Sequence, residues 1–284
     1  MAICPGIHGI RTVTGKGKRG GSRRLRGRGV YLLPNLLTTG ALFAGFYAII
    51  GAIDGNYERS AIALFCAVIL DGLDGRLARL TGTESDFGKE YDSLSDLVAF
   101  GLAPALIVYE WGLSRLDAFG WIWGKAGWLA AFLYAVSAAL RLARFNADPP
   151  STDRRFFEGL PSPSAAGLVF GMVWLGAELG WSGDLALIGA GLLTAAAGLL
   201  MISHIPYYSF KELSPRGKIP FTYLFVIPLI FVMIALNPPT VVFVIACTYA
   251  ASGPVYRVWR WRRRRARRRA ADAAAGARSG AGEA

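Results

Sequence analysis

The sequence DGLDGRLARLTGTESDFGKEYDSLSD, residues 71–96, lies between two apolar stretches, SAIALFCAVIL (60–70) and LVAFGLAPALIVYEW (97–111). Both stretches are apolar enough to lie in a lipid bilayer. Four aspartates nevertheless stand at their edges: Asp71, Asp74, Asp92 and Asp96. A charged side chain within the hydrocarbon of a membrane is costly, so acids at this depth indicate a functional site. The rest of the sequence narrows down which function this is.

The composition is that of a membrane protein. The chain has 284 residues, of which 54% are hydrophobic and 18% are charged, and its mean hydropathy is +0.39. A soluble domain of this length usually carries more charge, and here the apolar residues are gathered into long blocks. We therefore predict an all-α, polytopic membrane bundle that leaves no room for a second large soluble domain.

Eight segments are long and apolar enough to cross a bilayer, which takes about 20 residues of α-helix. They are 33–53, 59–79, 93–113, 122–145, 162–181, 184–203, 220–236 and 239–258. Basic residues gather in the loops on one side of these spans, whereas the opposite loops, such as DGNYER and NPP, carry little net positive charge. Because positively charged loops stay in the cytoplasm, we expect an inner-membrane protein with both termini and the aspartates on the cytoplasmic side.

The net charge of +12 is concentrated near the two ends, in GKGKRGGSRRLRGRG (15–29) and RVWRWRRRRARRR (257–269). We divide the chain into a basic cytoplasmic arm (1–30), a membrane domain (31–258) and a tail that is basic and then disordered (259–284). Beside membrane helices, basic clusters set topology and attract anionic lipid. We therefore expect anionic lipid, and no nucleic acid, as the partner of these ends.

The spacing of the aspartates lets them converge: Asp71 and Asp74 are three residues apart, so on a helix they share one face. Asp92 and Asp96, four residues apart, do likewise. Two neighbouring helices can therefore bring four carboxylates together at the cytoplasmic edge of the membrane. Mg²⁺ or Mn²⁺ suits carboxylates that also bind substrate phosphates. Two such ions, about 3.5–4 Å apart, would form a clamp for displacement at phosphorus.

Small residues accompany the acids on the second span. Gly72, Gly75 and Ala78 leave one side of this helix free of bulk, so a flat or charged ligand can approach its backbone. Arg76 and Arg79 supply donors for phosphate oxygens, and Arg79 is better placed because it lies one turn beyond Gly75. Carboxylates, a divalent metal and phosphate donors at the membrane edge together indicate a nucleotide-activated lipid as substrate.

Two other interpretations of the acids are open. They could pair with Arg76, Arg79 and Lys89 at a helix end, although four acids with interposed glycines make this the weaker explanation. They could also be ligands in a cation channel or carrier, but such a path needs polar groups throughout, and residues 162–258 offer almost none. A non-enzymatic membrane protein that binds divalent cations is therefore the rival from another functional class.

Residues 71–96 follow the pattern D-x-x-D-G-x-x-A-R-x8-G-x3-D-x3-D at every fixed position. This pattern resembles the signature of the CDP-alcohol phosphotransferases. The resemblance implies a membrane core of six helices, a homodimer, and a reaction in which an alcohol hydroxyl displaces CMP from a CDP-linked donor. The last two predicted spans are then additions to the catalytic core.

The resemblance also implies roles for individual residues. Asp71, Asp74 and Asp92 would be metal ligands. Asp96 would be the general base for the acceptor hydroxyl and a ligand of the second metal ion. Contacts to the CDP-linked donor are expected from the signature and from the PNLLT segment that opens the first span: Pro34, Asn35, Thr38, Gly75, Ala78, Arg79 and Ser85.

Outside the signature, the chain is similar to the integral-membrane phosphatidylserine synthases, in blocks that include PNLLTTGALFAGF, RLARFN, FEGLPSPSAAG and YYSFKEL. This similarity implies CDP-diacylglycerol as donor and L-serine as acceptor, with the serine hydroxyl attacking phosphorus in line while CMP leaves. Serine would be held by cytoplasm-side cations, an amide and a hydroxyl: Arg141, Arg144, Asn146, Ser162 and Lys211.

Alternatives stay open for the acceptor and for some of these residues. Glycerol 3-phosphate, inositol or its phosphate, and choline would use the same chemistry. Arg141 and Arg144 could be ordinary positive-inside anchors. Ser162, which stands between two prolines, could simply cap a helix.

Overall fold

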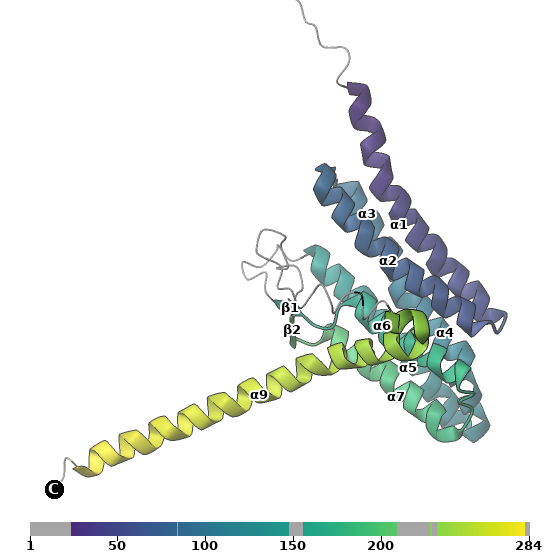
Figure 1. Ribbon diagram of the computed structural model, residues 1–284. Helices are drawn as coiled ribbons and strands as arrows, with labels where there is room; N and C mark the ends of the chain where they lie inside the picture. The colour runs from purple at the N-terminus through teal and green to yellow at the C-terminus, as the bar shows by residue number, and fades with distance from the viewer. Residues whose placement is uncertain (1–23, 84, 148–155, 209–227, 229–231, 282–284) are drawn as a thin grey trace, which may run out of the picture.

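The computed structural model of the protein describes residues 24–83, 85–147, 156–208, 228 and 232–281. Its architecture is a bundle of long helices, and one pair of three-residue strands is the only sheet in this part of the chain (Figure 1). The predicted all-α membrane bundle is confirmed. Lys211 and most of the predicted span 220–236 lie outside the described residues.

Helices α1 (Arg24–Ile53) and α2 (Tyr57–Thr81) form an antiparallel hairpin that opens the bundle (Figure 1). In the turn between them, Gly55 adopts a left-handed conformation with a φ of 75°, which a residue without a side chain adopts at little cost. α2 ends at Gly82, a second left-handed glycine. Both aspartates of α2 therefore lie near its C-terminal end.

The third helical segment is continuous but changes its winding in the middle. It runs as α3 (Asp86–Asp96), then a π-helical stretch η1 (Leu97–Leu102), then α4 (Ala103–Trp111). The hydroxyl of Ser85 caps α3 by accepting a hydrogen bond from the N–H of Gly88. The helix therefore begins at residue 86 rather than at the predicted 93, so both aspartates of this segment lie inside it.

The remaining elements complete the bundle: the 3-10 helix η2 (Leu113–Phe119), α5 (Trp121–Ala147), β1 (Phe156–Glu158), α6 (Ser162–Glu178), α7 (Asp184–Ile202), β2 (Pro206–Tyr208) and α9 (Pro238–Ala281). β1 and β2 pair antiparallel with Phe156 opposite Tyr208, so the chain after α7 returns to the start of α6. α9 packs against α6, and its C-terminal part projects away from the bundle (Figure 1).

Five helical segments of the described chain are long and apolar enough to cross a membrane: Leu33–Ile53, Asp86–Trp111, Trp121–Ala147, Asp184–Ile202 and Pro238–Arg265. They agree with five of the eight predicted spans. α2 covers the predicted 59–79 but does not qualify, because the acidic site makes it too rich in charge. α6 has only 17 residues, of which twelve are buried, so it is an interior helix that is shorter than predicted.

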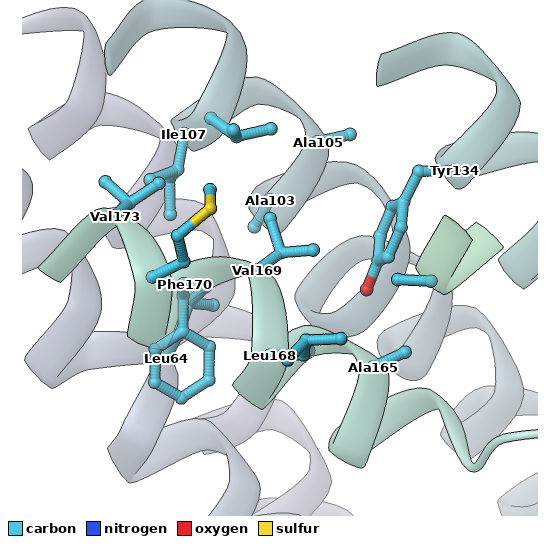
Figure 2. Close-up of a cluster of buried hydrophobic side chains, with 14 of the residues drawn as sticks. Leu64, Ala103, Ala105, Ile107, Tyr134, Ala165, Leu168, Val169, Phe170 and Val173 are labelled. Carbon is cyan, nitrogen blue, oxygen red and sulfur yellow. The ribbon is translucent and has the colours of Figure 1, made fainter. Parts of the chain in front are cut away.

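The core lies between α2, α4, α5 and α6, and Figure 2 shows part of it. Leu64, Ile107 and Phe170 contribute large side chains there, and each is at most 1% exposed. Many other buried positions are alanine or glycine, which lets helices approach closely, as Gly45 of α1 does against Ala99 of η1. Large apolar side chains on the outside of the bundle are exposed, as expected of helices that face lipid.

The two ends of the bundle have different characters. At one end, the C-terminal ends of α2 and α5 meet the N-terminal ends of α3 and α6, and the four aspartates lie here. At the other end, Tyr57, Glu110, Arg115 and Trp181 belong to the lining of a cavity of about 410 Å³. Because Tyr57 starts α2 and the acids lie near its end, about 20 Å of helix separates this cavity from the acids.

Candidate metal and substrate site

Three of the four signature aspartates meet at one end of the bundle. α2 contributes Asp71 and Asp74, α3 contributes Asp92, and one carboxylate oxygen from each lies within 4.8 Å of the others. α1 packs against both helices and so holds them at this spacing. Oxygens this close can share a divalent cation.

Asp96 completes the cluster. It lies one turn after Asp92 on α3, and its carboxylate is close enough to that of Asp71 for the two to interact. Three of the four carboxylates therefore form a compact cluster, and the fourth, that of Asp96, lies beside it. No ion pair in the described structure joins them to the basic side chains of α2 and α3, so the alternative of helix-end ion pairing is not what the protein adopts.

The residues present fit a divalent metal ion. Oδ1 of Asp92 is buried and has no hydrogen-bond partner in the part of the chain that the structure describes. An unpaired buried acceptor is costly, and the repulsion between neighbouring carboxylates adds to this cost. A hard cation with oxygen ligands would relieve both, and the aspartates supply the ligands that such a cation prefers.

Thr38 of α1 holds one of these carboxylates in place. Its Oγ1 donates a 2.7 Å hydrogen bond to Oδ2 of Asp74, and its backbone carbonyl accepts a 3.1 Å hydrogen bond from Oγ of Ser95. The Thr38 side chain is 5% exposed. The resemblance implied a contact with the donor nucleotide for Thr38, whereas the structure buries this residue and directs its hydroxyl at Asp74.

The glycines of α2 border open space. Among the described residues, a Cβ atom added at Gly72 would meet nothing within 4 Å, and one added at Gly75 would meet only the Arg79 guanidinium, at 3.9 Å. Packing within the protein therefore does not require glycine at either position. Nε of Arg79 donates to the carbonyl of Gly75, which holds the guanidinium along this surface. The arrangement leaves a strip of accessible backbone beside the carboxylates, as a bound nucleotide would need.

The other residues expected to bind the donor surround this strip. Asn35 is half-buried, and its side-chain oxygen lies 3.5 Å from where a Cβ atom on Gly88 would be. Ala78 is half-buried and Pro34 is buried. Ser85 is exposed, but its oxygen is already engaged as the cap of α3.

Two of the residues expected to bind the acceptor meet beside Asp96. Nη1 of Arg141 donates a 2.7 Å hydrogen bond to Oγ of Ser162, and the Arg141 charge lies close enough to Asp96 to attract it. Nε of Arg141 is buried and lacks a hydrogen-bond partner among the described residues. Ser162 is the first residue of α6 rather than its cap, because Pro161 takes the cap position. The interpretation of Ser162 as a helix cap is therefore wrong.

The remaining acceptor candidates have partners of their own. Arg144 forms an ion pair with Glu158 of β1, which ties α5 to the strand pair. Nδ2 of Asn146 donates to Oγ of Ser93, at 3.0 Å, and to Glu90 of α3, at 3.3 Å. Lys211, the last acceptor candidate, belongs to the part of the chain that is not described.

Sequence reasoning missed several residues that build the site. Ser93 and Ser95 reach α5 and α1 respectively, and both stand within the DSLSD segment between Asp92 and Asp96. Their place inside the signature was a signal, because small hydroxyl residues on a helix end often bond to a neighbouring helix. The role of Glu158 had no such signal, since its partner is fourteen residues earlier in the chain.

Comparison with known proteins agrees with this geometry. The sequence profile described as CDP-alcohol phosphatidyltransferase matches residues 31–208, which contain all four aspartates. The chain belongs to this family. CDP-alcohol phosphatidyltransferases generally use a divalent metal, in agreement with the carboxylate cluster. The resemblance found in the signature is thus confirmed.

Individual relatives within the family match most of the chain. A CDP-diacylglycerol–serine O-phosphatidyltransferase of Helicobacter pylori strain J99 is 38% identical over 204 residues, which are 72% of this chain and 83% of that protein. One from Mycobacterium leprae is 34% identical over 241 residues, 82% of this chain and 76% of the other. An archaetidylserine synthase of Methanothermobacter thermautotrophicus is 35% identical over 177 residues, 62% and 69% of the two chains.

Proposed function

We propose that the protein transfers a phosphatidyl group from CDP-diacylglycerol to the hydroxyl of L-serine, which yields phosphatidylserine and CMP. The observation that carries this proposal is the convergence of Asp71, Asp74 and Asp92 within 4.8 Å. Beside them lie Asp96 and Arg141, whose Nε has no hydrogen-bond partner among the described residues. The names of relatives at 34–38% identity support serine as the acceptor.

Asp71, Asp74 and Asp92 would hold a divalent metal, and Asp96 would also bind a second ion. We propose Mg²⁺ or Mn²⁺, two per site, because carboxylates that act together with substrate phosphates suit these hard cations. When bound, the ions supply neutralisation of the pyrophosphate charge and of the charge that develops at phosphorus. The hydrogen bond from Thr38 keeps Asp74 turned toward this task.

The donor would lie along the open strip of α2. Gly75 and Ala78 admit the CDP group close to the helix backbone, and Arg79 offers its guanidinium to a phosphate oxygen. Asn35 and Ser85 border the strip from α1 and from the start of α3. Pro34 and Thr38 would contribute through packing and through Asp74, since both are buried.

The chemical step needs one proton acceptor. Asp96 would take the proton of the serine hydroxyl, so that the serine oxygen attacks the phosphorus that bears diacylglycerol. The bond from that phosphorus to the bridging oxygen breaks in line, and CMP leaves with the electron pair. Asp96 is suited to this role because it is close to Asp71, a proposed metal ligand, and to Arg141, which is proposed to bind the acceptor.

The acceptor would be held by its carboxylate. Within the described part of the chain, the buried Nε of Arg141 has no hydrogen-bond partner, and Ser162 already orients the same guanidinium, so a carboxylate would complete its hydrogen bonds. Arg144, Asn146 and Lys211 would form the outer part of this pocket.

We further propose an inner-membrane homodimer, with residues 31–258 as the membrane domain and with the active site and both termini in the cytoplasm. The basic ends, 1–30 and 259–284, would bind anionic lipid. On α9, Arg263 stacks over the ring of Trp259 at 3.8 Å, and Arg265 lies 5.2 Å from the ring of Trp261. Arginines paired with interfacial tryptophans suit the boundary between lipid headgroups and hydrocarbon.

The test is CMP release by the full-length protein, purified in detergent with Mn²⁺ or Mg²⁺ and CDP-diacylglycerol, with and without L-serine. We expect release that depends on both serine and metal. Release with glycerol 3-phosphate or inositol in place of serine would retain the chemistry and replace the acceptor. If folded protein released no CMP with any acceptor but bound Mn²⁺, a non-enzymatic cation-binding protein would be the better description.

A further inference from the structure

The helix that carries Asp92 and Asp96 is interrupted immediately after Asp96 by the π-helical stretch η1. Its winding is documented by the N–H of Ala103, which donates to the carbonyl five residues earlier, that of Val98. π-helical stretches inside α-helices are rare and are often found at functional sites. We call η1 the π-turn below. Each residue of an α-helix turns the chain by about 100°. The wider winding of η1 therefore changes the direction of the α3 face that carries Asp92 and Asp96, relative to α4.

Pro104 explains why this turn needs outside support. In an α-helix the carbonyl of Phe100 would accept a hydrogen bond from the N–H of residue 104, and proline has none. The structure supplies a replacement from α5: the hydroxyl of Tyr134 donates a 2.9 Å hydrogen bond to the carbonyl of Phe100. Tyr134 and Phe100 are both fully buried, so bulk solvent does not reach this carbonyl.

The tyrosine itself is held firmly. Figure 2 shows Tyr134 within the hydrophobic cluster, with its hydroxyl directed into the bundle. α7 approaches its backbone so closely that a Cβ atom on Gly198 would lie 3.1 Å from the Cα atom of Tyr134. A Cβ atom on Gly101 of η1 would lie 3.1 Å from the Cβ atom of Ala138 on α5. η1 therefore rests on α5 through this contact and through the hydrogen bond from Tyr134 to Phe100.

We propose that Tyr134 is a positioning residue for the carboxylate cluster. By holding the carbonyl of Phe100, it stabilises the π-turn, and the π-turn directs Asp92 and Asp96 toward Asp71 and Asp74. A role of Tyr134 in catalysis rests on the proposed function. Its effect on metal binding does not, and can be measured without substrate. Tyr134 is fully buried and its hydroxyl bonds to the carbonyl of Phe100, so it acts through the backbone of η1.

The experiment measures equilibrium Mn²⁺ binding to the full-length protein in detergent, without substrate, from the electron paramagnetic resonance signal of free Mn²⁺. Tyr134→Phe retains the ring and removes the hydroxyl. We expect its Mn²⁺ dissociation constant to rise about fivefold, the size expected when one neutral buried hydrogen bond is lost. Gly101→Ala, which pushes η1 away from Ala138, should raise the dissociation constant in the same direction.

The matched control is Tyr207→Phe. Tyr207 is also fully buried, and its hydroxyl also donates to a backbone carbonyl, that of Ala250 at 3.0 Å, but on α9 rather than on η1. Thermal unfolding of all three variants shows how much stability each loses. We expect Tyr207→Phe to lose stability while it retains the Mn²⁺ affinity of the wild type.

If Tyr134→Phe lost stability as Tyr207→Phe does but bound Mn²⁺ as the wild type does, the tyrosine would be an ordinary core residue and the inference would be wrong. If Tyr134→Phe failed to fold, the Mn²⁺ affinity of Gly101→Ala would decide. CMP release is measured in parallel on the wild type. Wild-type protein that bound Mn²⁺ without releasing CMP would overturn the proposed function and leave the positioning role to be judged by the binding data.

Discussion

The hydroxyl of Thr38 on α1 donates a 2.7 Å hydrogen bond to the carboxylate of Asp74 on α2, thirty-six residues later in the chain. The bond is buried and orients one oxygen of a proposed metal ligand. Ligand-orienting hydrogen bonds of this kind commonly matter almost as much as the ligands themselves. Through this hydrogen bond, α1 helps to position a proposed metal ligand on α2.

Thr38→Val should lower CMP release about five- to tenfold and raise the Mn²⁺ concentration needed for half-maximal activity, because one buried hydrogen bond to a ligand is lost. Kinetic titration with Mn²⁺ measures both. The control is Thr248→Val, since the Thr248 hydroxyl bonds to its own helix at Val244, away from the acids. An unchanged Mn²⁺ requirement in Thr38→Val would contradict the orienting role.

Asp96→Asn and Asp71→Asn should fail in different ways. Without its proton acceptor, Asp96→Asn should lose at least about 100-fold in turnover, while part of its binding of CDP-diacylglycerol survives. Asp71→Asn should weaken metal-dependent donor binding itself. Turnover and donor binding are measured on both variants, and near-normal activity in Asp96→Asn would remove Asp96 from the role of base.

Removal of the metal should destabilise the protein as well as inactivate it. A ligand that binds the folded state stabilises it by mass action, and here it also relieves the repulsion among four carboxylates. Mn²⁺ added after chelation should therefore restore CMP release and raise Tm by several degrees. Asp92→Asn serves as the comparison, because it removes one proposed metal ligand. If Mn²⁺ raised the Tm of Asp92→Asn as much as that of the wild type, the stabilising ion would bind at another site.

Arg141→Lys should raise KM for L-serine about tenfold or more and leave KM for CDP-diacylglycerol nearly unchanged. Lysine retains the charge, but it cannot offer the second planar donor that a carboxylate requires. Arg144→Lys is the comparison, and its smaller expected effect follows from the engagement of Arg144 by Glu158. If both variants changed KM for serine equally, the outer pocket would hold the carboxylate instead.

Deletion of residues 259–284 should remove the interaction of the tail with anionic lipid and leave the chemical step unchanged. The deleted segment includes the Trp259–Arg263 and Trp261–Arg265 contacts. In detergent with neutral lipid, CMP release by the shortened protein should match that of the full chain. In vesicles with increasing anionic lipid, only the full chain should gain activity, and added salt should reduce the gain. Equal responses of the two proteins would remove the tail from lipid binding.

Features encoded along the chain could be predicted without the fold. The intervals between Asp71 and Asp74, and between Asp92 and Asp96, place each pair on one helix face, because an α-helix has a fixed period. Hydropathy located the helices for a similar reason, since a bilayer requires apolar segments of a known length. The fixed spacing of the signature was sufficient to identify the family.

The π-turn could be anticipated only in part. Pro104 announces a missing hydrogen bond inside a predicted span, but it does not say whether the helix will kink, end or change its winding. That choice depends on the hydroxyl of Tyr134, which comes from another helix thirty-four residues away. Pro104 thus marks a place where the helix can lose its regularity, and contacts with α5 decide how it does so.

The sequence by itself determined the membrane bundle, the family and the four aspartates. The tertiary structure decided which residues contact one another in the site: Thr38 contacts Asp74, Asp96 lies close to Asp71, and Ser162 bonds to Arg141. The physical reason is that helix periodicity and motif spacing are local properties of the chain. Pairing between helices depends on how far each one is rotated and shifted against the next, and only the packing of the whole bundle sets that.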